Sequence, residues 1–454
     1  MKRDEASSTL IKGATLIEGE GRRIADLRIA SGRIDQIAEK ISPRAGDLVV
    51  DGEGKWLLPG MIDVHVHFRE PGLESKADME SESRAAAAGG ITSVMEMPNT
   101  LPQTVTLERV REKFLLASKK CAVNHSFYLG ATNDNIDEIL KANSEEICGV
   151  KLFMGASTGN LLVEKDSSLR RIFADSPLLI AVHCEDTPTI KRAEEEAKKK
   201  YGAAVPFELH AEIRSAEACF HSSSLAVELA NEYHARLHLL HITTLQELSL
   251  LSDLPLEKKR ITAEVCIPHL WFEKSSYELL GGRLKCNPAV KSLEDRNALR
   301  RALKTGLIDL LATDHAPHTF QEKSGSYFDA PSGLPSIQEA LPLSLELAAK
   351  GHWSAETVVQ RYAHAPAQLF GIQERGFLRE GYWADLVLVE PMALHQVEAS
   401  ALLSKCGWSP WEGEMLHHQI EKSWVNGSLA WNAAEPKKRY PVASKALRFS
   451  NNRR

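Results

Sequence analysis

The chain has 454 residues, a formal net charge of −6, and 43% hydrophobic and 26% charged residues. These proportions are ordinary for a globular protein, and the length exceeds the size at which one core usually stops growing, so we expect one large and one smaller domain. Charges of both signs are spread along the chain, which excludes the basic footprint of a nucleic-acid binder.

The N-terminal segment shows short β-like runs. Its first residues, MKRDEASSTL, lack the apolar core of a signal peptide. No apolar run in the chain approaches the roughly 20 residues needed to cross a bilayer, so we expect a cytoplasmic protein without a membrane partner. Residues 8–58 alternate β-like runs with glycine-containing turns, which indicates a meander of short strands.

From Met61 onward the pattern becomes that of a parallel α/β protein. Apolar runs alternate with helical stretches such as LERVREKFLLASKK and DRNALRRALKTG. This alternation favours a parallel sheet, and eight such units point to a closed (β/α)8 barrel of the TIM type. The eight runs are IDVHVHF, ITSVMEM, VNHSFYLG, GVKLFMG, LLIAVHCE, RLHLLHIT, RITAEVC and IDLLATDHA.

After Gly371 short strand-like runs return, in GFLREGYWADLVLVE and EKSWVNGSLAWN. We predict that residues 1–58 and 372–454 together form a small β-sandwich beside a barrel of residues 59–371. The stretch from Pro436 to the end is basic and contains proline, which favours a surface tail over a fold element.

The strongest chemical feature is the sequence His65-Val66-His67-Phe68-Arg69. Alternate residues of a strand share one face, so the two histidines and the arginine should project together. Two neutral imidazoles on one face are a natural chelate for a metal such as zinc. An isolated pair of this kind is more often two hydrogen-bonded core histidines. The residues at the other strand ends decide whether this pair is structural or binds a metal.

Four later strands carry further residues of ligand type. Lys151 lies inside an apolar run, where a charge is costly unless it is paired. His183, His241 and Asp314 end three other runs. Each has a structural alternative when taken singly: a snorkelling lysine, a buried histidine or a helix-capping aspartate. In a barrel, however, all these strand ends face one active-site mouth, and together with the first histidine pair they make a binuclear ligand set.

These motifs resemble one known family. The segments PGMIDVHVHFREPG, MPNT, GVKLFMG, VHCED, HIT, NPAVK, ATDHAPH and GWSPWEG are similar to those of the cyclic amidohydrolases, and specifically to the dihydroorotases with FREPG after the metal histidines. The resemblance runs from about Leu58 to Gly413. It implies two Zn²⁺ ions per subunit, bridged by Lys151 after its carboxylation. His65, His67 and Asp314 would then hold the more buried ion, and His183 and His241 the other.

The resemblance also implies a reaction. Metal coordination lowers the pKa of water toward about 7, so a hydroxide shared by the two ions can attack a ring amide carbonyl. Asp314 would serve as general acid and base. The expected activity is the reversible interconversion of (S)-dihydroorotate and N-carbamoyl-L-aspartate in de novo pyrimidine (UMP) biosynthesis, in the cytoplasm. We also expect a homodimer, because twofold dimers are the commonest oligomers.

Arg69 is the residue that bears on the substrate. Dihydroorotate carries a carboxylate that hydantoins and dihydropyrimidines lack, and a guanidinium binds a carboxylate in a bidentate manner. A surface ion pair with Glu70 or Glu74 is the structural alternative. The resemblance implies that two further residues complete the carboxylate pocket, Asn99 and His318, and that the ring is contacted by Asn287 and by the backbone near Pro331 and Gly333.

Several alternatives stay open at this point. The same fold and metals could serve a hydantoinase, dihydropyrimidinase or allantoinase, or a non-catalytic relative could keep the barrel for assembly. Asp63 could be a group behind the metal ligands or a structural acid, and residues 319–332 could be a mobile lid or a plain surface loop. His315 is expected to be structural, and His238, without ligand spacing, to be a surface or core residue.

Overall fold

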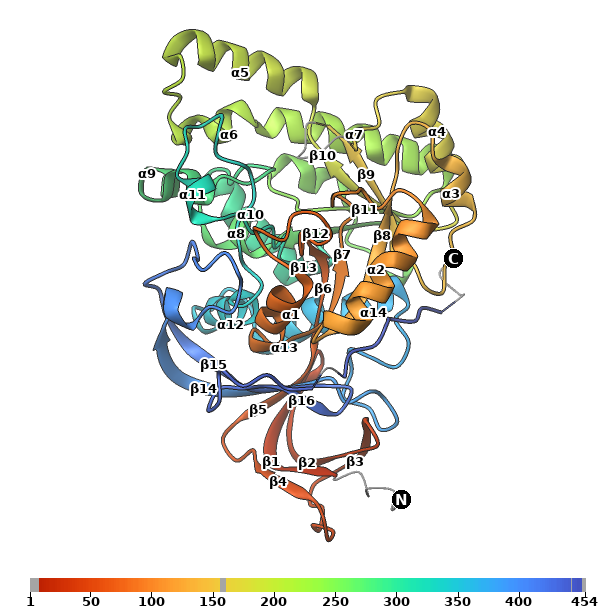
Figure 1. Ribbon diagram of the computed structural model, residues 1–454, viewed down its shortest axis with the longest axis vertical. Coiled ribbons are helices and arrows are strands. Elements are labelled where there is room, and N and C mark those ends of the chain that lie inside the picture. Colours follow the sequence, from red (N-terminus) through yellow and green to blue (C-terminus); the bar gives the residue numbers. More distant parts are fainter. Residues whose placement is uncertain (1–7, 156–160, 442, 451–454) are drawn as a thin grey trace.

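A barrel of eight parallel strands occupies the centre of the computed structural model, which describes residues 8–155, 161–441 and 443–450 (Figure 1). Strands adjacent in sequence are adjacent in the sheet, and the barrel closes where Val66 pairs with His315. The predicted (β/α)8 barrel is therefore confirmed. Its strands are β6 (Met61–Val66), β7 (Ile91–Glu96), β8 (Asn124–Gly130), β9 (Gly149–Met154), β10 (Ile180–Cys184), β11 (Leu237–Leu239), β12 (Ile261–Cys266) and β13 (Leu310–Ala312).

The barrel strands are apolar along their whole length because both of their faces are covered. Every residue of β6 to β10 is buried, as expected for strands packed between a barrel interior and a layer of helices. Helix starts follow local capping rules: Asp78 caps α1 and Ser292 caps α10, each in a capping box. Among the described helices, none is long and apolar enough to cross a membrane.

Most of the helices lie between successive barrel strands (Figure 1). The chain continues from β13 through α11 to α14 before it enters the second sheet. The helices are α1 (Met79–Ala88), α2 (Leu107–Lys120), α3 (Ile136–Leu140), α4 (Asp166–Asp175), α5 (Thr187–Tyr201), α6 (His210–Ile213), α7 (Ala216–Tyr233), α8 (Ile267–Trp271), α9 (Ser276–Leu280), α10 (Leu293–Thr305), α11 (Phe320–Lys323), α12 (Ala340–Ala349), α13 (Ala355–Val359) and α14 (Ala365–Phe370).

The two terminal segments join in one mostly antiparallel sheet, which lies below the barrel in Figure 1. The junction is the antiparallel pair of β5 and β14. The predicted β unit built from both chain ends is confirmed, while its limits at residues 58 and 372 stay a prediction. Its strands are β1 (Thr9–Glu18), β2 (Gly21–Ala30), β3 (Arg33–Ala38), β4 (Leu48–Asp51), β5 (Trp56–Pro59), β14 (Leu386–Gln396), β15 (Met415–Val425) and β16 (Ser428–Asn432).

The prediction of a surface tail from Pro436 is wrong for residues 443–450. Ala446 forms a parallel bridge with His125 of the barrel strand β8, and Phe449 pairs with Ile372. Leu447 and Phe449 are buried. The alternation of apolar and polar residues in ALRFS is that of a half-buried extended segment, and the surrounding basic residues obscured it.

Candidate active site

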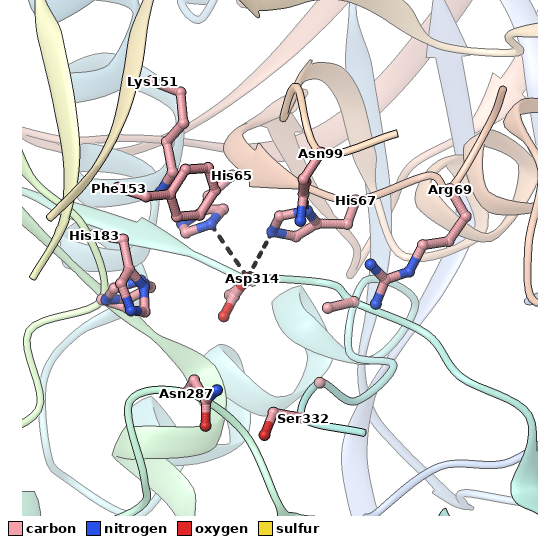
Figure 2. A pocket seen from close by; sticks show the side chains of 13 residues that line it. His65, His67, Arg69, Asn99, Lys151, Phe153, His183, Asn287, Asp314 and Ser332 are labelled. Atoms are coloured by element: carbon pink, nitrogen blue, oxygen red, sulfur yellow. Dashed lines mark hydrogen bonds and ion pairs between the residues drawn. The ribbon is translucent and has the colours of Figure 1, made fainter. Parts of the chain in front are cut away.

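A pocket at the carboxyl ends of the barrel strands gathers the predicted site residues (Figure 2). In parallel barrels this end carries the active site. Of the predicted residues, His318 and Pro331 are outside the lining, and His318 contacts Arg69, which is inside it. The lining consists of His65, His67, Arg69, Asn99, Lys151, Phe153, His183, His241, Asn287, Asp314, Ala316, Ser332 and Gly333.

Two histidines and one aspartate converge at the point where the barrel closes. The Nε2 atoms of His65 and His67 lie 3.2 and 3.1 Å from Oδ1 of Asp314 (Figure 2). His65 lies in β6 and His67 directly follows that strand. Asp314 lies just beyond β13, the strand next to β6 where the barrel closes. Imidazole nitrogens that meet a carboxylate oxygen are a donor set suited to a divalent cation such as zinc.

The proton positions on this histidine pair are set by two side-chain acceptors, the buried Glu264 and the half-buried Asn99. Nδ1 of His65 lies 2.6 Å from Oε1 of Glu264, and Nδ1 of His67 lies 2.7 Å from Oδ1 of Asn99. Each acceptor holds a proton on Nδ1, so Nε2 is the nitrogen that a neutral ring has left for a metal ion. Burial also lowers the pKa of His67 to about 4, which keeps that ring neutral.

Positive charge is favoured at the centre of this cluster. Burial opposes a charge on His65, yet the carboxylates of Asp314 and Glu264 raise its pKa to about 9. A proton on His65 therefore compensates the two carboxylates when no other cation does so. A bound metal ion would meet the same need, because opposite charges at this distance in a buried site attract strongly.

The second histidine pair has buried nitrogens without hydrogen-bond partners. Nδ1 of His183 lies 2.9 Å from Nε2 of His241. The remaining nitrogens, Nε2 of His183 and Nδ1 of His241, have no hydrogen-bond partner among the described residues, although Nε2 of His183 lies 3.1 Å from Oε2 of Glu185. An unsatisfied buried polar group costs about 1–3 kcal/mol, so these nitrogens indicate a ligand. One nitrogen each of His65 and His241 and an oxygen of Asp314 lie within 4.8 Å of one another.

Lys151 lies in the interior of β9 and is 1% exposed. Its Nζ lies 4.5 Å from the centre of the Phe153 ring, and no described carboxylate forms an ion pair with it. Burial lowers the pKa of Lys151 to about 8. A neutral amine is the form that reacts with carbon dioxide, so the surroundings of this lysine suit carboxylation.

The predicted structural alternative for Arg69 is not present. Its side chain is buried, and neither neighbouring glutamate pairs with it. Glu70 forms an ion pair with Lys120, and Oε1 of Glu74 accepts a hydrogen bond from the backbone N–H of Gly72 at 2.9 Å. Among the described residues, Arg69 therefore has no carboxylate partner.

Arg69 is instead held by the loop that follows Asp314. Its Nε donates to the Pro317 carbonyl at 3.0 Å, and its Nη2 lies 3.0 Å from Nε2 of His318. Nζ of Lys76 lies 3.1 Å from Nδ1 of the same histidine. The ring of His318 thus stands between two cations, which together with burial hold its pKa well below the usual range. Lys76 is paired with Glu322 at 2.8 Å, so the charge of Arg69 is the one left at this corner of the pocket without a carboxylate in ion-pair contact among the described residues.

Asp63, whose role the sequence left open, and His315, which was expected to be structural, both have contacts outside the pocket lining. Asp63 joins β6 to β13, since its Oδ2 accepts from Thr313 Oγ1 at 2.6 Å and its Oδ1 accepts from the His65 amide at 3.2 Å. Nε2 of His315 lies 2.8 Å from Oε2 of Glu82, away from the pocket lining. Both fasten the strands on which the site is built.

Sequence reasoning missed a fully buried carboxylate beside the site. Glu264 lies in β12, is fully buried, and contacts both His65 and His238. It stands in the apolar run RITAEVC, where the cost of a buried charge, the same signal that singled out Lys151, could have found it. His238 is a core residue, and its partner Glu264 ties it to the site.

The chain belongs to the amidohydrolase family, whose model matches residues 56–429. A barrel with histidines, a lysine and an aspartate at its strand ends agrees with that assignment. The chain is 35% identical over 428 residues to a dihydroorotase of Halobacterium salinarum, covering 93% of this chain and 96% of the relative. It is 30% identical over 434 residues to a dihydroorotase of Staphylococcus epidermidis, covering 93% and 99%.

Solved structures share the fold over nearly the whole chain. An L-hydantoinase (dihydropyrimidinase) from Arthrobacter aurescens superposes with a TM-score of 0.91 at 27% identity, covering 97% of this chain and 99% of that one. A dihydropyrimidinase from Brevibacillus agri superposes with a TM-score of 0.87 at 21% identity, covering 98% and 99%. The second likeness bears on the fold alone.

Proposed function

We propose that the chain is a dihydroorotase, which interconverts (S)-dihydroorotate and N-carbamoyl-L-aspartate in pyrimidine biosynthesis. The observation that carries the proposal is the buried guanidinium of Arg69, which lines the same pocket as the predicted metal ligands and has no carboxylate partner among the described residues. A buried cation without a counterion favours an anionic ligand. The dihydroorotases among the chain's relatives support the same activity.

The residues present fit the two Zn²⁺ ions that the proposal needs. Nδ1 of His241, which has no hydrogen-bond partner among the described residues, and the convergence of His65 and His67 on Asp314 are the supporting observations. We assign His65, His67 and Asp314 to one ion, His183 and His241 to the other, and carboxylated Lys151 to both. Bound there, the ions would polarise the ring carbonyl and activate water at neutral pH.

Asp314 is the proposed general base and acid. Burial alone would raise its pKa, but the adjacent His65 and His67 hold that pKa well below its usual range. Asp314 is therefore a carboxylate before the reaction and can accept the proton of the attacking water. It returns that proton to the ring nitrogen as the C–N bond breaks. Ring closure uses the same two transfers in reverse.

The proposed substrate contacts use groups that the fold leaves free. Oδ1 of Asn99 accepts from His67, so its amide N–H groups are left for the substrate carboxylate beside Arg69. Oδ1 of Asn287 is buried and has no hydrogen-bond partner among the described residues. We propose that it accepts from a ring N–H, with the Gly333 backbone also in the lining. His318 borders the carboxylate subsite through Arg69.

A substrate panel tests the proposal. Zinc-loaded enzyme should turn over dihydroorotate and carbamoyl aspartate far faster than hydantoin, dihydrouracil or allantoin. The second candidate function is that of a cyclic amidase acting on neutral rings, because an L-hydantoinase shares the fold. A preference for a neutral ring in this panel would favour that function. Less than one zinc per chain after purification, with no turnover, would support a non-catalytic relative.

We also propose a cytoplasmic homodimer with domains at residues 1–58 plus 372–454 and 59–371. The dimer rests on the prevalence of twofold assemblies. Light scattering of the purified protein measures the oligomeric state, and limited proteolysis followed by mass spectrometry tests the domain limits. A monomer by scattering would contradict the dimer.

A further inference from the structure

One wall of the pocket is built from two loops that carry none of the metal ligands. Asn287 comes from the loop before α10, and Ser332 and Gly333 come from the loop after α11. In Figure 2, Asn287 and Ser332 lie across the pocket from Asn99 and Lys151. The affinity for a ring bound between the two sides therefore depends on how these two loops are positioned relative to each other.

A buried ammonium group joins the two loops at this wall. Nζ of Lys323, the last residue of α11, donates to three backbone carbonyls: Lys285 at 2.8 Å, Pro331 at 2.7 Å and Gly333 at 2.7 Å. Burial lowers the pKa of Lys323 well below its usual value. All three partners are carbonyl acceptors, however, and only the ammonium form supplies three N–H donors. The side chain is 2% exposed and forms no ion pair with a described carboxylate.

The carbonyls that Lys323 binds belong to the wall itself. Gly333 lines the pocket, and Lys285 is two residues before Asn287. The Gly333 amide also donates to the Lys285 carbonyl at 2.9 Å, so this residue is held at both its N–H and its C=O. Its φ of +130° favours glycine, and an added Cβ would lie 2.6 Å from the Ala316 carbonyl oxygen. The backbone therefore has little freedom at this point.

We propose that Lys323 is a positioning residue that sets the separation of the two loops, and through it the affinity of the pocket for the substrate ring. The inference rests on the proposed function, because the ring is that of dihydroorotate. Charge-assisted hydrogen bonds are roughly twice as strong as neutral ones, and three of them converge from a single side chain on both loops. The same contacts fix residues 331–333 in the pocket wall.

A neighbouring lysine provides a matched control. Nζ of Lys285 donates to the carbonyls of Tyr327 at 2.5 Å and Ala330 at 2.8 Å, and its side chain is also buried. It braces the same loop, but neither of its partners lines the pocket. Replacing the side chain of Lys285 removes a second buried lysine that donates to backbone carbonyls. It keeps the backbone carbonyl of residue 285, to which Lys323 donates.

The experiment compares Lys323→Met with Lys285→Met in the zinc-loaded full chain. For Lys323→Met we expect KM for dihydroorotate to rise about tenfold while kcat changes by less than about threefold, as for loss of a group that acts on binding. Zinc content should stay at the wild-type value, and hydrogen exchange at the Gly333 amide should accelerate. For Lys285→Met, whose side chain holds the same loop at residues outside the lining, we expect a KM rise at least about threefold smaller than that of Lys323→Met.

Two results would overturn the inference: an unchanged KM in folded Lys323→Met, or an equal KM rise in Lys285→Met. If Lys323→Met does not fold, Lys323→Gln, which keeps two N–H donors without the charge, should show an intermediate KM. Wild-type exchange supplies a test that needs no variant and no turnover: the Gly333 amide should exchange more slowly than the Gly325 amide in the same loop, and equal rates would refute the brace. Inactive wild-type enzyme with a protected Gly333 amide would count against the proposed function alone.

Discussion

Glu264 should control how tightly the site binds metal. Its Oε1 lies 2.6 Å from Nδ1 of His65 and accepts from the His241 amide at 3.2 Å, while its Oε2 lies 3.2 Å from Nε2 of His238. One carboxylate thus supports a proposed ligand of each ion. Partners of this kind orient the histidine ring and raise its basicity toward the metal.

The expected loss of zinc affinity in Glu264→Gln follows from the hydrogen bonds that a glutamine side chain can still form. The amide oxygen can face His65 and the His241 amide, and the NH2 can face His238. Nε2 of His238 then accepts, because its proton can move to Nδ1, which lies 2.9 Å from Thr262 Oγ1. The contacts survive but the charge is lost, which weakens them by about 1–1.5 kcal/mol. Zinc affinity should fall about tenfold. Glu264→Ala leaves two buried donors unsatisfied and should cost about 100-fold or more.

Competition with a chelator of known zinc affinity measures the effect on metal-free protein. Glu247→Gln is the matched control, since Glu247 is a buried carboxylate that accepts from Ser223 at 2.7 Å and Thr244 at 2.9 Å and contacts no proposed ligand. Its zinc affinity should equal that of the wild type. Zinc binding by Glu264→Gln within twofold of wild type, with the thermal unfolding of both variants cooperative, would refute the reasoning.

Three further predictions concern the proposed chemistry. Asp314→Asn should keep the far-ultraviolet circular dichroism of the wild type but lower kcat by about 10²- to 10⁴-fold, and near-normal turnover would rule out its role as acid and base. Arg69→Gln should raise KM for dihydroorotate by about 10- to 100-fold, and an unchanged KM would remove Arg69 from the substrate site. Chelation of bound zinc should lower Tm, since ligand at 1,000 times its Kd stabilises the fold by about 4 kcal/mol; calorimetric scans that coincide with and without chelator would contradict a bound metal.

The fold was predictable because its signals are local. Each barrel strand is an apolar run bounded by helical segments, and burial on both faces demands that composition. The ligand-type residues stand out for the same reason, since Lys151 is a charge inside such a run. The family motifs supplied the rest of the candidate set. Residues 443–450 were misjudged because their alternation is short and lies among lysines and arginines.

The supporting contacts could not be predicted, because they join residues far apart in the sequence. Glu264 lies 199 positions from His65, and Lys323 lies 38 positions from Lys285. Periodicity gives the face of an element on which a side chain lies, but it does not give the partner across the barrel. A lone lysine after an aspartate motif is ordinarily a solvated side chain. The three carbonyls around Nζ of Lys323 show that this one is not.

Backbone conformation at the strand ends explains why so many side chains converge in one pocket. Arg69, His241 and Asp314 have φ values of +67°, +38° and +48°, which side-chain-bearing residues rarely adopt. Each such residue costs about 1–3 kcal/mol and persists only where its surroundings hold it. Those surroundings are visible here: Arg69 is tied to the Pro317 carbonyl, the His241 amide donates to Glu264, and Asp314 is held between two histidines. Glycine would relieve the strain but would remove the functional group. The strain is therefore tolerated where the proposed chemistry needs a side chain and a sharp change of chain direction at the same residue.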